Sequence, residues 1–257
     1  MIVQQNYRPL GCGECTGGAG LDFDFTMAFQ PIVNTTTGEI FAHEALARGL
    51  NNEPAAEIFK LVNEQNRYRF DQACRVKAVQ LASQLNVGSY ISINFMPNAV
   101  YRPELCIRTT LEAADKFGFP VERIIFEFTE GEQVLDISHL KDIVHHYQSQ
   151  GFLTAIDDFG AGYAGLHLLA EVQTDLLKLD MSLIRDIHKD KARRAIAKAT
   201  IQMCRELSMQ VIAEGIESVD ELSVLQDLGV EIFQGYYFAR PAFRALATVP
   251  RDLLLRA

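Results

Sequence analysis

Two kinds of hydrophobic pattern alternate along most of the chain. Short apolar runs of strand length are followed by stretches in which apolar residues recur every three or four positions. The first pattern is typical of buried β-strands and the second of amphipathic helices that cover them. Alternation at this spacing predicts parallel βαβ units.

The periodic region opens with two strands that we expect to be antiparallel. The apolar segment 26–33 is followed by the polar, glycine-ended turn 34–38 and by a second apolar segment, 39–46. A short polar turn between two such runs is typical of a β-hairpin. The hairpin therefore places one antiparallel pair in an otherwise parallel sheet.

The patterns after the hairpin predict six further strands with helices between most of them. The expected strands lie at 90–95, 123–129, 152–157, 175–180, 210–214 and 231–238. The expected helices lie at 55–65, 67–85, 103–118, 138–150, 163–170, 190–208 and 218–229. Within the 190–208 helix we expect one buried stripe, made of Ile196, Thr200, Met203 and Leu207.

Three local signals fix the expected ends of these helices. Pro103 and Gly118 give one helix a proline start and a glycine stop. Ser138 is expected to begin the helix that ends before Gly151. Ser218 and Glu221 have the S-x-x-E spacing of a capping box.

Eight strands with intervening helices predict an α/β protein whose domain, residues 22–257, is a (β/α)₈ TIM-like barrel with an antiparallel first strand. An open, doubly wound sheet would alternate in a similar way, so this pattern alone leaves both topologies open. Residues 1–21 are rich in glycine and show almost no apolar periodicity, which indicates a flexible leader.

Composition narrows the class of protein. The chain has 257 residues, 48% hydrophobic and 22% charged, as in an ordinary globular protein. Lys and Arg number 24 and Asp and Glu 33, which gives a net charge of −9. This excess of acid argues against a protein that holds long nucleic acid by charge, although a small phosphorylated ligand could bind through metals or a few local cations.

Targeting signals and cysteines are sparse. No apolar run approaches the ~18 residues of a membrane span, and the N-terminus lacks an apolar signal core. The five cysteines are scattered and odd in number, which argues against a disulfide framework and favours the reducing cytoplasm. Cys12 and Cys15 form a lone C-x-x-C, which is either part of a tail without function or half of a metal or redox site.

Polar residues stand at the C-terminal ends of seven consecutive predicted strands. They are Glu44, Asn94, Glu127, Asp157 with Asp158, Lys178, Glu214 and Gln234. In a (β/α)₈ barrel these positions meet at one mouth, which is where barrel enzymes keep their active sites. Helix capping alone would not explain a polar group on so many strands, so we expect a functional site.

The residue types at this mouth indicate metal chemistry. Five carboxylates in a small volume would repel one another at low dielectric unless cations lay between them. Ligands that are all oxygen, without His or Cys, favour Mg²⁺ or Mn²⁺ over zinc. Two such ions close together are typical of phosphoester hydrolysis, and Lys178 adds a cation for a phosphate or for the attacking water.

A dinucleotide-binding fingerprint offers a competing interpretation. The glycines at 160, 162 and 165 match G-x-G-x-x-G after a strand, and Asp180 lies 20 residues beyond the first. However, Asp157 and Asp158 would repel a pyrophosphate there, and the motif lies in the middle of the strand series. A tight, movable loop that carries the two aspartates explains these glycines better.

Taken together and in order, these segments resemble the EAL family of cyclic di-GMP phosphodiesterases. The resemblance covers about residues 23–245 and rests on Gln30-Pro-Ile, Glu44-Ala-Leu-Ala-Arg48, Ser92-Ile-Asn94, Glu127-Phe-Thr-Glu130, Asp157-Asp-Phe-Gly-Ala-Gly-Tyr163, Leu177-Lys178-Leu-Asp180, Ala213-Glu214-Gly215 and Gln234-Gly-Tyr236. Each motif is weak alone, but eight in the same order are specific.

The resemblance implies an enzyme that hydrolyses cyclic di-GMP to linear pGpG with two Mg²⁺ or Mn²⁺ ions, and that Ca²⁺ inhibits. The implied ligands of the first metal are Glu44, Asn94, Glu127 and Asp157, and those of the second are Asp157, Asp158 and Glu214. Lys178 resembles the residue that orients the attacking water, and Glu214 resembles a base. Glu130 resembles the anchor of the 158–165 loop.

The resemblance also implies substrate contacts and a partner. Gln30 and Arg48 resemble substrate-binding residues, with Arg48 suited to a phosphate, and Gln234 resembles a polar group on the floor of the site. A homodimer with helices beside the 158–165 loop at its interface is expected.

Ala47, Gly49 and Met181 depart from the usual family pattern without removing an implied metal ligand. The alternative function is a catalytically weak cyclic di-GMP receptor or a protein-interaction regulator.

Overall fold

The strands of the protein close into a barrel. The computed structural model describes residues 21–129, 136–162 and 165–254. The barrel strands are β1 (Thr26–Asn34), β2 (Glu39–Arg48), β3 (Tyr90–Asn94), β4 (Ile124–Thr129), β5 (Leu153–Phe159), β6 (Leu176–Leu179), β7 (Gln210–Ala213) and β8 (Ile232–Gln234). From β2 to β8 each strand pairs in parallel with the next one.

β1 closes the ring and is antiparallel to both of its neighbours, β2 and β8. A short strand, β9 (Ala242–Phe243), adds to β1 on the outside. The predicted (β/α)₈ barrel with an antiparallel first strand is therefore confirmed. A doubly wound sheet is excluded, because its edge strands would not pair with each other.

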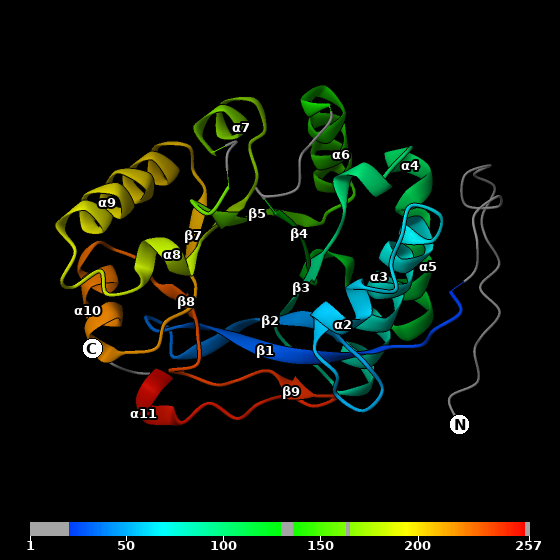
Figure 1. Ribbon diagram of the computed structural model, residues 1–257, viewed down its shortest axis with the longest axis horizontal. Coiled ribbons are helices and arrows are strands. Elements are labelled where there is room, and N and C mark those ends of the chain that lie inside the picture. The colour runs from blue at the N-terminus through cyan, green and yellow to red at the C-terminus, as the bar shows by residue number, and fades with distance from the viewer. Residues whose placement is uncertain (1–20, 130–135, 163–164, 255–257) are drawn as a thin grey trace.

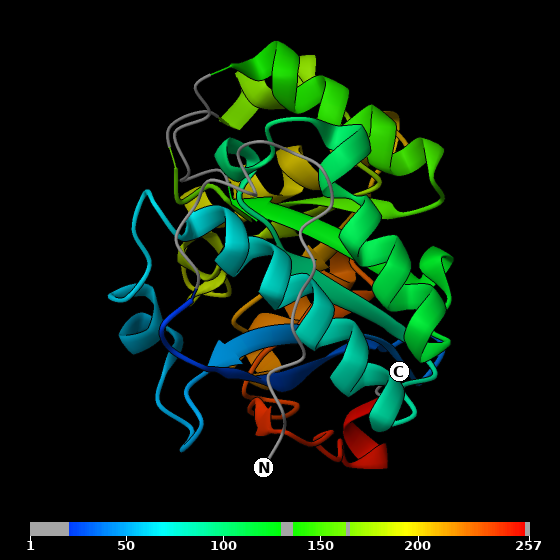
Figure 2. The ribbon, with the colours of Figure 1, turned by 90° about the vertical axis from the view of Figure 1, so that its right-hand side faces the viewer.

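Helices surround the barrel (Figures 1 and 2). They are α2 (Ala55–Phe59), α3 (Arg67–Gln84), α4 (Pro103–Cys106), α5 (Arg108–Phe117), α6 (Ile137–Ser149), α7 (Gly165–Glu171), α8 (Met181–Ile184), α9 (Lys191–Glu206), α10 (Val219–Asp227) and α11 (Arg251–Leu254), with 3₁₀ turns at Pro97–Ala99 and Val121–Arg123. Among the described residues, no helix is long and apolar enough to cross a membrane.

The hydrophobic core has two parts that leave one end of the barrel to polar groups. The larger part lies between the strands and the helices. The smaller part fills the barrel interior with Ile32, Ala42, Ile125, Ala155, Leu176, Ile212 and Ile232. Most of these seven come early in their parallel strands, so the apolar plug sits toward the N-terminal end of the barrel, away from the polar strand ends.

Several predicted helix boundaries were wrong. The helix expected at 55–65 ends at Phe59, because Phe59 and Leu61 are about half exposed and only Ile58 is buried to hold it. The helix expected at 103–118 divides into α4 and α5 around Ile107. The N-cap of α6 is Asp136, whose side chain accepts the backbone N–H of His139, rather than Ser138.

The predicted buried stripe of α9 was partly wrong. Thr200 is buried, and Met203 and Leu207 are half-buried against the core, but Ile196 is 49% exposed. The other buried residues are Ala197, Ile201 and Cys204. The helix turns its small residues toward the barrel, which permits closer packing than a stripe headed by Ile196. The capping box of Ser218 and Glu221 is present as predicted.

The last predicted strand, 231–238, is a three-residue strand that stops at Gln234, and neither β9 nor α11 was predicted. Beyond Gln234 the chain turns sharply at Gly235, next to the backbone of Ile216. Residues 1–20, with Cys12 and Cys15, lie outside the described part of the chain, so the division into leader and barrel stays a prediction.

Candidate active site

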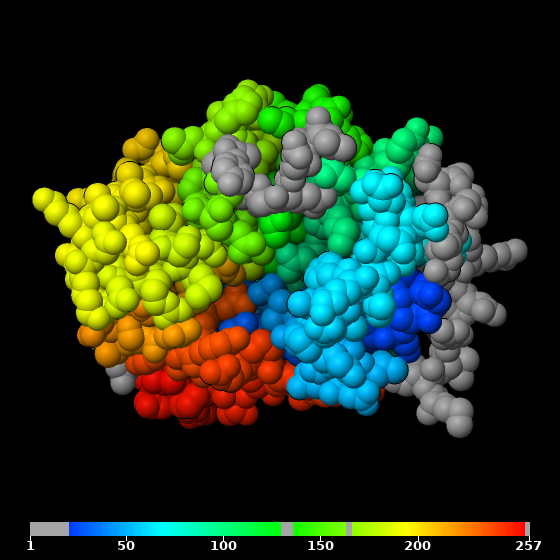
Figure 3. Space-filling view, viewed as in Figure 1, coloured from blue at the N-terminus to red at the C-terminus, as the bar shows by residue number. Residues whose placement is uncertain are grey.

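The predicted strand-end residues meet at the C-terminal mouth of the barrel. A pocket of about 290 Å³ opens there, and its lining comes from β1, β2, β5, α8 and the segments after β6, β7 and β8. The lining residues are Gln30, Glu44, Asp157, Asp158, Asp180, Met181, Glu214, Gly215, Glu217, Gln234, Gly235 and Tyr236. The space-filling view is hollowed near its centre, with blue residues of the N-terminal strands visible at depth (Figure 3).

The buried Lys178 is the centre of the site. Its Nζ lies 2.8 Å from Glu214, 3.0 Å from both Glu127 and Asp157, and 3.7 Å from Glu44. Lys178 is 0% exposed, so it makes these contacts below the floor of the pocket. Four carboxylates from four different strands or strand ends therefore share one ammonium group.

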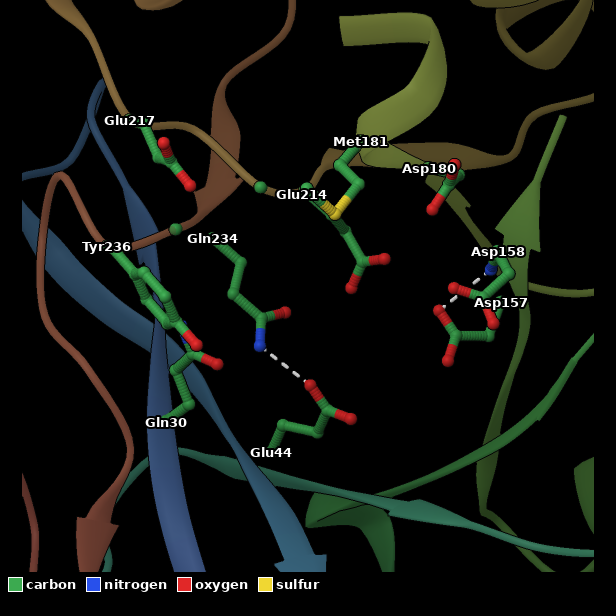
Figure 4. Close-up of a pocket in the computed structure, with 12 residues that line it drawn as sticks. Gln30, Glu44, Asp157, Asp158, Asp180, Met181, Glu214, Glu217, Gln234 and Tyr236 are labelled. Carbon is green, nitrogen blue, oxygen red and sulfur yellow. Dashed lines mark hydrogen bonds between the residues drawn. The ribbon is translucent and has the colours of Figure 1, made fainter. Parts of the chain in front are cut away.

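Amide and hydroxyl groups orient two of these carboxylates. Asn94 Nδ2 donates to Glu44 Oε1 at 3.0 Å, and Gln234 Nε2 donates to Glu44 Oε2 at 2.6 Å (Figure 4). The Ser92 hydroxyl donates to Glu127 Oε1. Gln234 Oε1 is buried and has no hydrogen-bond partner within the described residues, so an acceptor is available to a bound group.

The carboxylates form two groups with metal-binding geometry. Glu44, Glu127 and Asp157 each offer an oxygen within 4.8 Å of the others, and so do Asp157, Asp158 and Glu214. Asp157 belongs to both groups, so it could bridge two cations. These oxygen donors fit a hard cation such as Mg²⁺ or Mn²⁺. The carboxylates are the ones that the family resemblance implies as ligands, and the assignment of metal ligands stays a prediction.

Without cations, three carboxylates of the site, Glu127, Asp158 and Glu214, have raised pKa values. Burial raises the pKa of Glu127 to about 8; Lys178 opposes this shift, and the charges of Glu44 and Asp157 add to it. Burial also raises the pKa of Glu214 well above its usual value. The pKa of Asp158 rises to about 6, through burial and the charge of Asp157.

Lys178 keeps its proton in this environment. Burial by itself would lower the pKa of the ammonium group, but the surrounding carboxylates, led by Asp157 and Glu127, raise it well above the usual value. A lysine held in its charged form can donate hydrogen bonds and cannot accept a proton. The ammonium group is therefore suited to orienting an oxygen atom.

The residues expected to bind substrate divide into two groups. Gln30 and Gln234 line the pocket, and Gln30 Nε2 donates to the carbonyl of Ala239 at 3.3 Å. Arg48 is at the end of β2, where it donates to the carbonyl of Ala47 at 2.7 Å, and it is not among the lining residues. Glu130 lies outside the described residues.

The structure adds site residues that the predictions did not assign. Ser92 shares its strand face with Asn94, two residues away, so the alternation of β3 could have identified it. The exposed ring of Tyr236 lines the pocket, with the Arg240 guanidinium carbon 4.0 Å from its centroid. Asp180, Met181 and Glu217 complete the rim. Asp180 ends one of the family motifs and Met181 follows it, but neither residue is given a role in the site by the sequence.

Two backbone features shape the mouth. Asp158 has a φ of 55°, a left-handed conformation that Asp tolerates better than most residues. A Cβ on Gly235 would lie 2.1 Å from the carbonyl oxygen of Ile216, so only glycine lets β8 turn this close to the segment after β7. Both features hold site residues in place, since Gln234 directly precedes Gly235.

Comparison with known proteins gives consistent matches. The family model of the EAL domain matches residues 21–241. A standalone versatile EAL protein from Vibrio cholerae O395, solved in its c-di-GMP-bound form, is 58% identical, with a TM-score of 0.88 over 91% of this chain and 98% of that chain. The manganese and cyclic diGMP complex of Klebsiella pneumoniae BlrP1 at pH 9.0 is 31% identical, with a TM-score of 0.83 over 90% of this chain and 60% of that chain.

Curated relatives are longer proteins. The blue light- and temperature-regulated antirepressor BluF of Escherichia coli K12 is 32% identical over 223 residues, which cover 86% of this chain and 55% of BluF. The probable cyclic di-GMP phosphodiesterase PdeG of the same organism is 29% identical, over 83% of this chain and 44% of PdeG. The chain thus spans about half the length of these relatives.

Proposed function

This chain belongs to the EAL domain family, and we propose that it is a metal-dependent phosphodiesterase that hydrolyses cyclic di-GMP to linear pGpG. Such an activity lowers the level of a second messenger. The observation that carries the proposal is the pair of carboxylate groups that share Asp157 around the buried Lys178 at the barrel mouth. A purely structural role would not require five acidic side chains to converge in one pocket.

The two groups of carboxylate oxygens support an assignment of the metal ligands. The first cation would be held by Glu44, Asn94, Glu127 and Asp157, and the second by Asp157, Asp158 and Glu214. When bound, Mg²⁺ or Mn²⁺ lowers the pKa of a water molecule and neutralises the charge of the phosphodiester. Ca²⁺ should inhibit, because its larger and looser coordination shell misplaces the reacting groups.

The remaining residues of the site orient water and substrate. Lys178 would hold the attacking oxygen through its ammonium group, and Glu214, 2.8 Å from Lys178 Nζ, would accept the water's proton. Gln30 and Gln234 would hydrogen-bond the substrate at the pocket wall. Arg48 would bind a phosphate, and Glu130 would anchor the 158–165 loop.

Relatives support the substrate and the metal. The solved relatives include the V. cholerae protein with bound c-di-GMP, and BlrP1 complexes of cyclic di-GMP with manganese and with calcium. Among the curated relatives, PdeG is named a probable cyclic di-GMP phosphodiesterase and NbdA of Pseudomonas aeruginosa a cyclic di-GMP phosphodiesterase. These likenesses support the same substrate for this chain, and a direct test decides it.

A second candidate function is that of a receptor or protein-interaction regulator with little catalysis. The specific observation that favours it is the 32% identity to BluF, which is named an antirepressor. Against it, the five carboxylates implied as metal ligands and the lysine lie together at the barrel mouth. The phosphodiesterase and the receptor differ in turnover, and the protein-interaction regulator need not bind cyclic di-GMP.

The test therefore measures binding and turnover on the same preparation. Calorimetry with Ca²⁺ gives the affinity for cyclic di-GMP without reaction, and exchange into Mg²⁺ or Mn²⁺ starts hydrolysis. The phosphodiesterase proposal expects tight binding followed by conversion of the bound nucleotide. Tight binding with no conversion in either metal would support the receptor. No binding would overturn both the phosphodiesterase and the receptor, and would support the protein-interaction regulator.

We also propose that the protein works as a homodimer in the cytoplasm. Leu166, on α7 beside the 158–165 loop, is 69% exposed, so its side chain is available to an interface. The three cysteines in the described residues, Cys74, Cys106 and Cys204, are free thiols, which suits a reducing compartment.

A further inference from the structure

Helix α3 carries a buried charged network that the catalytic site does not use. Arg75 is 0% exposed, and its guanidinium lies 2.7 Å from the carboxylate of Asp71, one turn earlier. It also donates to the hydroxyl of Tyr147, on α6, at 2.8 Å. We call Asp71, Arg75 and Tyr147 the α3 clamp.

The α3 clamp lies against the outer side of β3 and β4, two of the strands that carry proposed metal ligands. The Arg75 guanidinium carbon is 5.4 Å from the ring centroid of Phe95 and 5.0 Å from that of Phe126. Phe95 directly follows Asn94, and Phe126 directly precedes Glu127. Because strand side chains alternate, these rings face the helices while Asn94 and Glu127 face the barrel interior.

Backbone hydrogen bonds connect the clamp to the same two strand ends. Asp71 Oδ1 accepts the backbone N–H of Met96 at 2.9 Å, two residues beyond Asn94. The backbone N–H of Phe95 donates to the carbonyl of Glu127 at 2.8 Å. The clamp thus holds the segment after β3, and that segment in turn holds the end of β4.

Stability alone is a poor reason for this network. Burying an ion pair costs desolvation that its attraction often fails to repay, and apolar replacements of buried ion pairs are often neutral or stabilising. The Arg75 Nε is buried without a hydrogen-bond partner in the described part of the chain, so the desolvation is incompletely offset. An entirely apolar core at this place would avoid that desolvation.

We propose that the α3 clamp is a positioning device, which fixes the ends of β3 and β4 and thereby the separation of Asn94 and Glu127 as ligands of the first metal. The inference rests on the metal site of the proposed function. Groups that orient metal ligands typically contribute ~10–100-fold to metal affinity. The clamp acts through the ligands and touches neither metal nor substrate.

The test removes both charges of the clamp and measures metal binding without substrate. In the double variant Asp71→Asn, Arg75→Met, the amide that replaces the Asp71 carboxylate can still accept the N–H of Met96, and no unpaired charge is left behind. Titration calorimetry with Mn²⁺ should show binding at least about tenfold weaker than in the wild type. The melting temperature of the metal-free variant should be unchanged or higher.

Two further variants separate positioning from general stability. Arg75→Lys keeps the charge but loses the planar guanidinium, so its Mn²⁺ affinity should lie between those of the wild type and the double variant. Gln148→Met removes hydrogen bonds to Thr154 and Asp175 near the start of β5, away from the site. This control should lower the melting temperature and leave Mn²⁺ affinity unchanged.

Each outcome supports or overturns the inference. Unchanged Mn²⁺ affinity in a folded double variant would overturn it, as would an equal loss of affinity in Gln148→Met. If the double variant does not fold, Tyr147→Phe decides, because it removes one hydroxyl: an affinity about twofold to fivefold weaker supports the clamp, and an unchanged affinity overturns it. A wild type that binds no Mn²⁺ would instead contradict the proposed function.

Discussion

At the scale of the residue, the site places several carboxylates around one ammonium group, and their repulsion is relieved only when further positive charge is bound. Lys178 is surrounded by four carboxylates within 4.0 Å, of which Glu127 and Glu214 have raised pKa values. One ammonium group offsets only part of that negative charge. Binding of divalent cations should therefore release protons from these carboxylates.

Loss of one metal ligand should abolish turnover. Glu44→Ala removes a carboxylate of the first oxygen group, so hydrolysis of cyclic di-GMP should fall by at least about 10³-fold. The matched control is Glu39→Ala, which changes an exposed glutamate at the other end of the same strand. Steady-state kinetics with Mn²⁺ give both rates, and a Glu44→Ala rate close to that of the control would remove Glu44 from the metal site.

The metal-free protein should lose stability as the pH rises from about 6.5 to about 8. Glu127 has a pKa of about 8 in the folded chain against an ordinary value of 4.5, so the folded chain holds more protons in this window and unfolding becomes easier as the pH rises. Burial lowers the pKa of His43 from 6.5 to about 4, so His43 binds protons only in the unfolded chain and opposes this fall near pH 6.5. The part of the window above about pH 7, where His43 is mostly neutral in both states, therefore reports Glu127.

Urea unfolding in excess chelator measures this dependence. In Glu127→Gln the fall across this pH window should be shallower, and in the wild type the stabilisation by saturating Mn²⁺ should grow with pH. Stability that is flat or rises over this window in the chelated wild type would contradict the raised pKa of Glu127.

At the scale of the element, the segment after β8 depends on one close approach of two backbones. Gly235→Ala would place a Cβ against Ile216, so we expect a loss of about 1–3 kcal/mol in the free energy of unfolding. Turnover should fall as well, because Gln234 would shift. Gly88→Ala is the matched control, since its Cβ would meet no atom within 4 Å and should change neither quantity.

The barrel could be predicted from the sequence because apolar strand segments that end in polar residues recur along the chain, with helical segments between them. Alternation along β3 and β4 is enough to place Asn94 and Glu127 on the inner face. The failures lie where tertiary contacts decide. The side of α9 that faces the barrel depends on how closely Ala197 and Cys204 can pack against it. The end of β8 depends on the contact between Gly235 and Ile216, which are too far apart in the sequence for a local pattern to report it.

The rim of the site is the other part that the sequence did not assign. Glu217 and Tyr236 come from segments whose course depends on the turns after β7 and β8. Arg48 is a different case. The resemblance assigns it to the substrate, and its guanidinium contacts the Ala47 carbonyl beside the pocket lining, so its substrate role stays a prediction.

At the scale of the whole molecule, the apolar plug of the barrel directs ligands to a single mouth. The helices beside the 158–165 loop flank this mouth, and we expect them to form the interface of a homodimer. Light scattering should therefore give twice the mass of one chain at assay concentration. Leu166→Glu should yield a monomer with a reduced rate, since charge on an exposed apolar contact opposes association. A monomeric wild type with full turnover would show that dimerisation is unnecessary.

The most direct test of the proposed chemistry follows the oxygen of the attacking water. Purified protein is mixed with cyclic di-GMP and Mn²⁺ in ¹⁸O-labelled water. The products are separated by chromatography, and their masses are measured by mass spectrometry. We expect linear pGpG with one ¹⁸O on its terminal phosphate, and no product in excess chelator or with Asp157→Asn. Intact cyclic di-GMP in the presence of Mn²⁺, or hydrolysis that continues in the chelator, would contradict a metal-dependent phosphodiesterase.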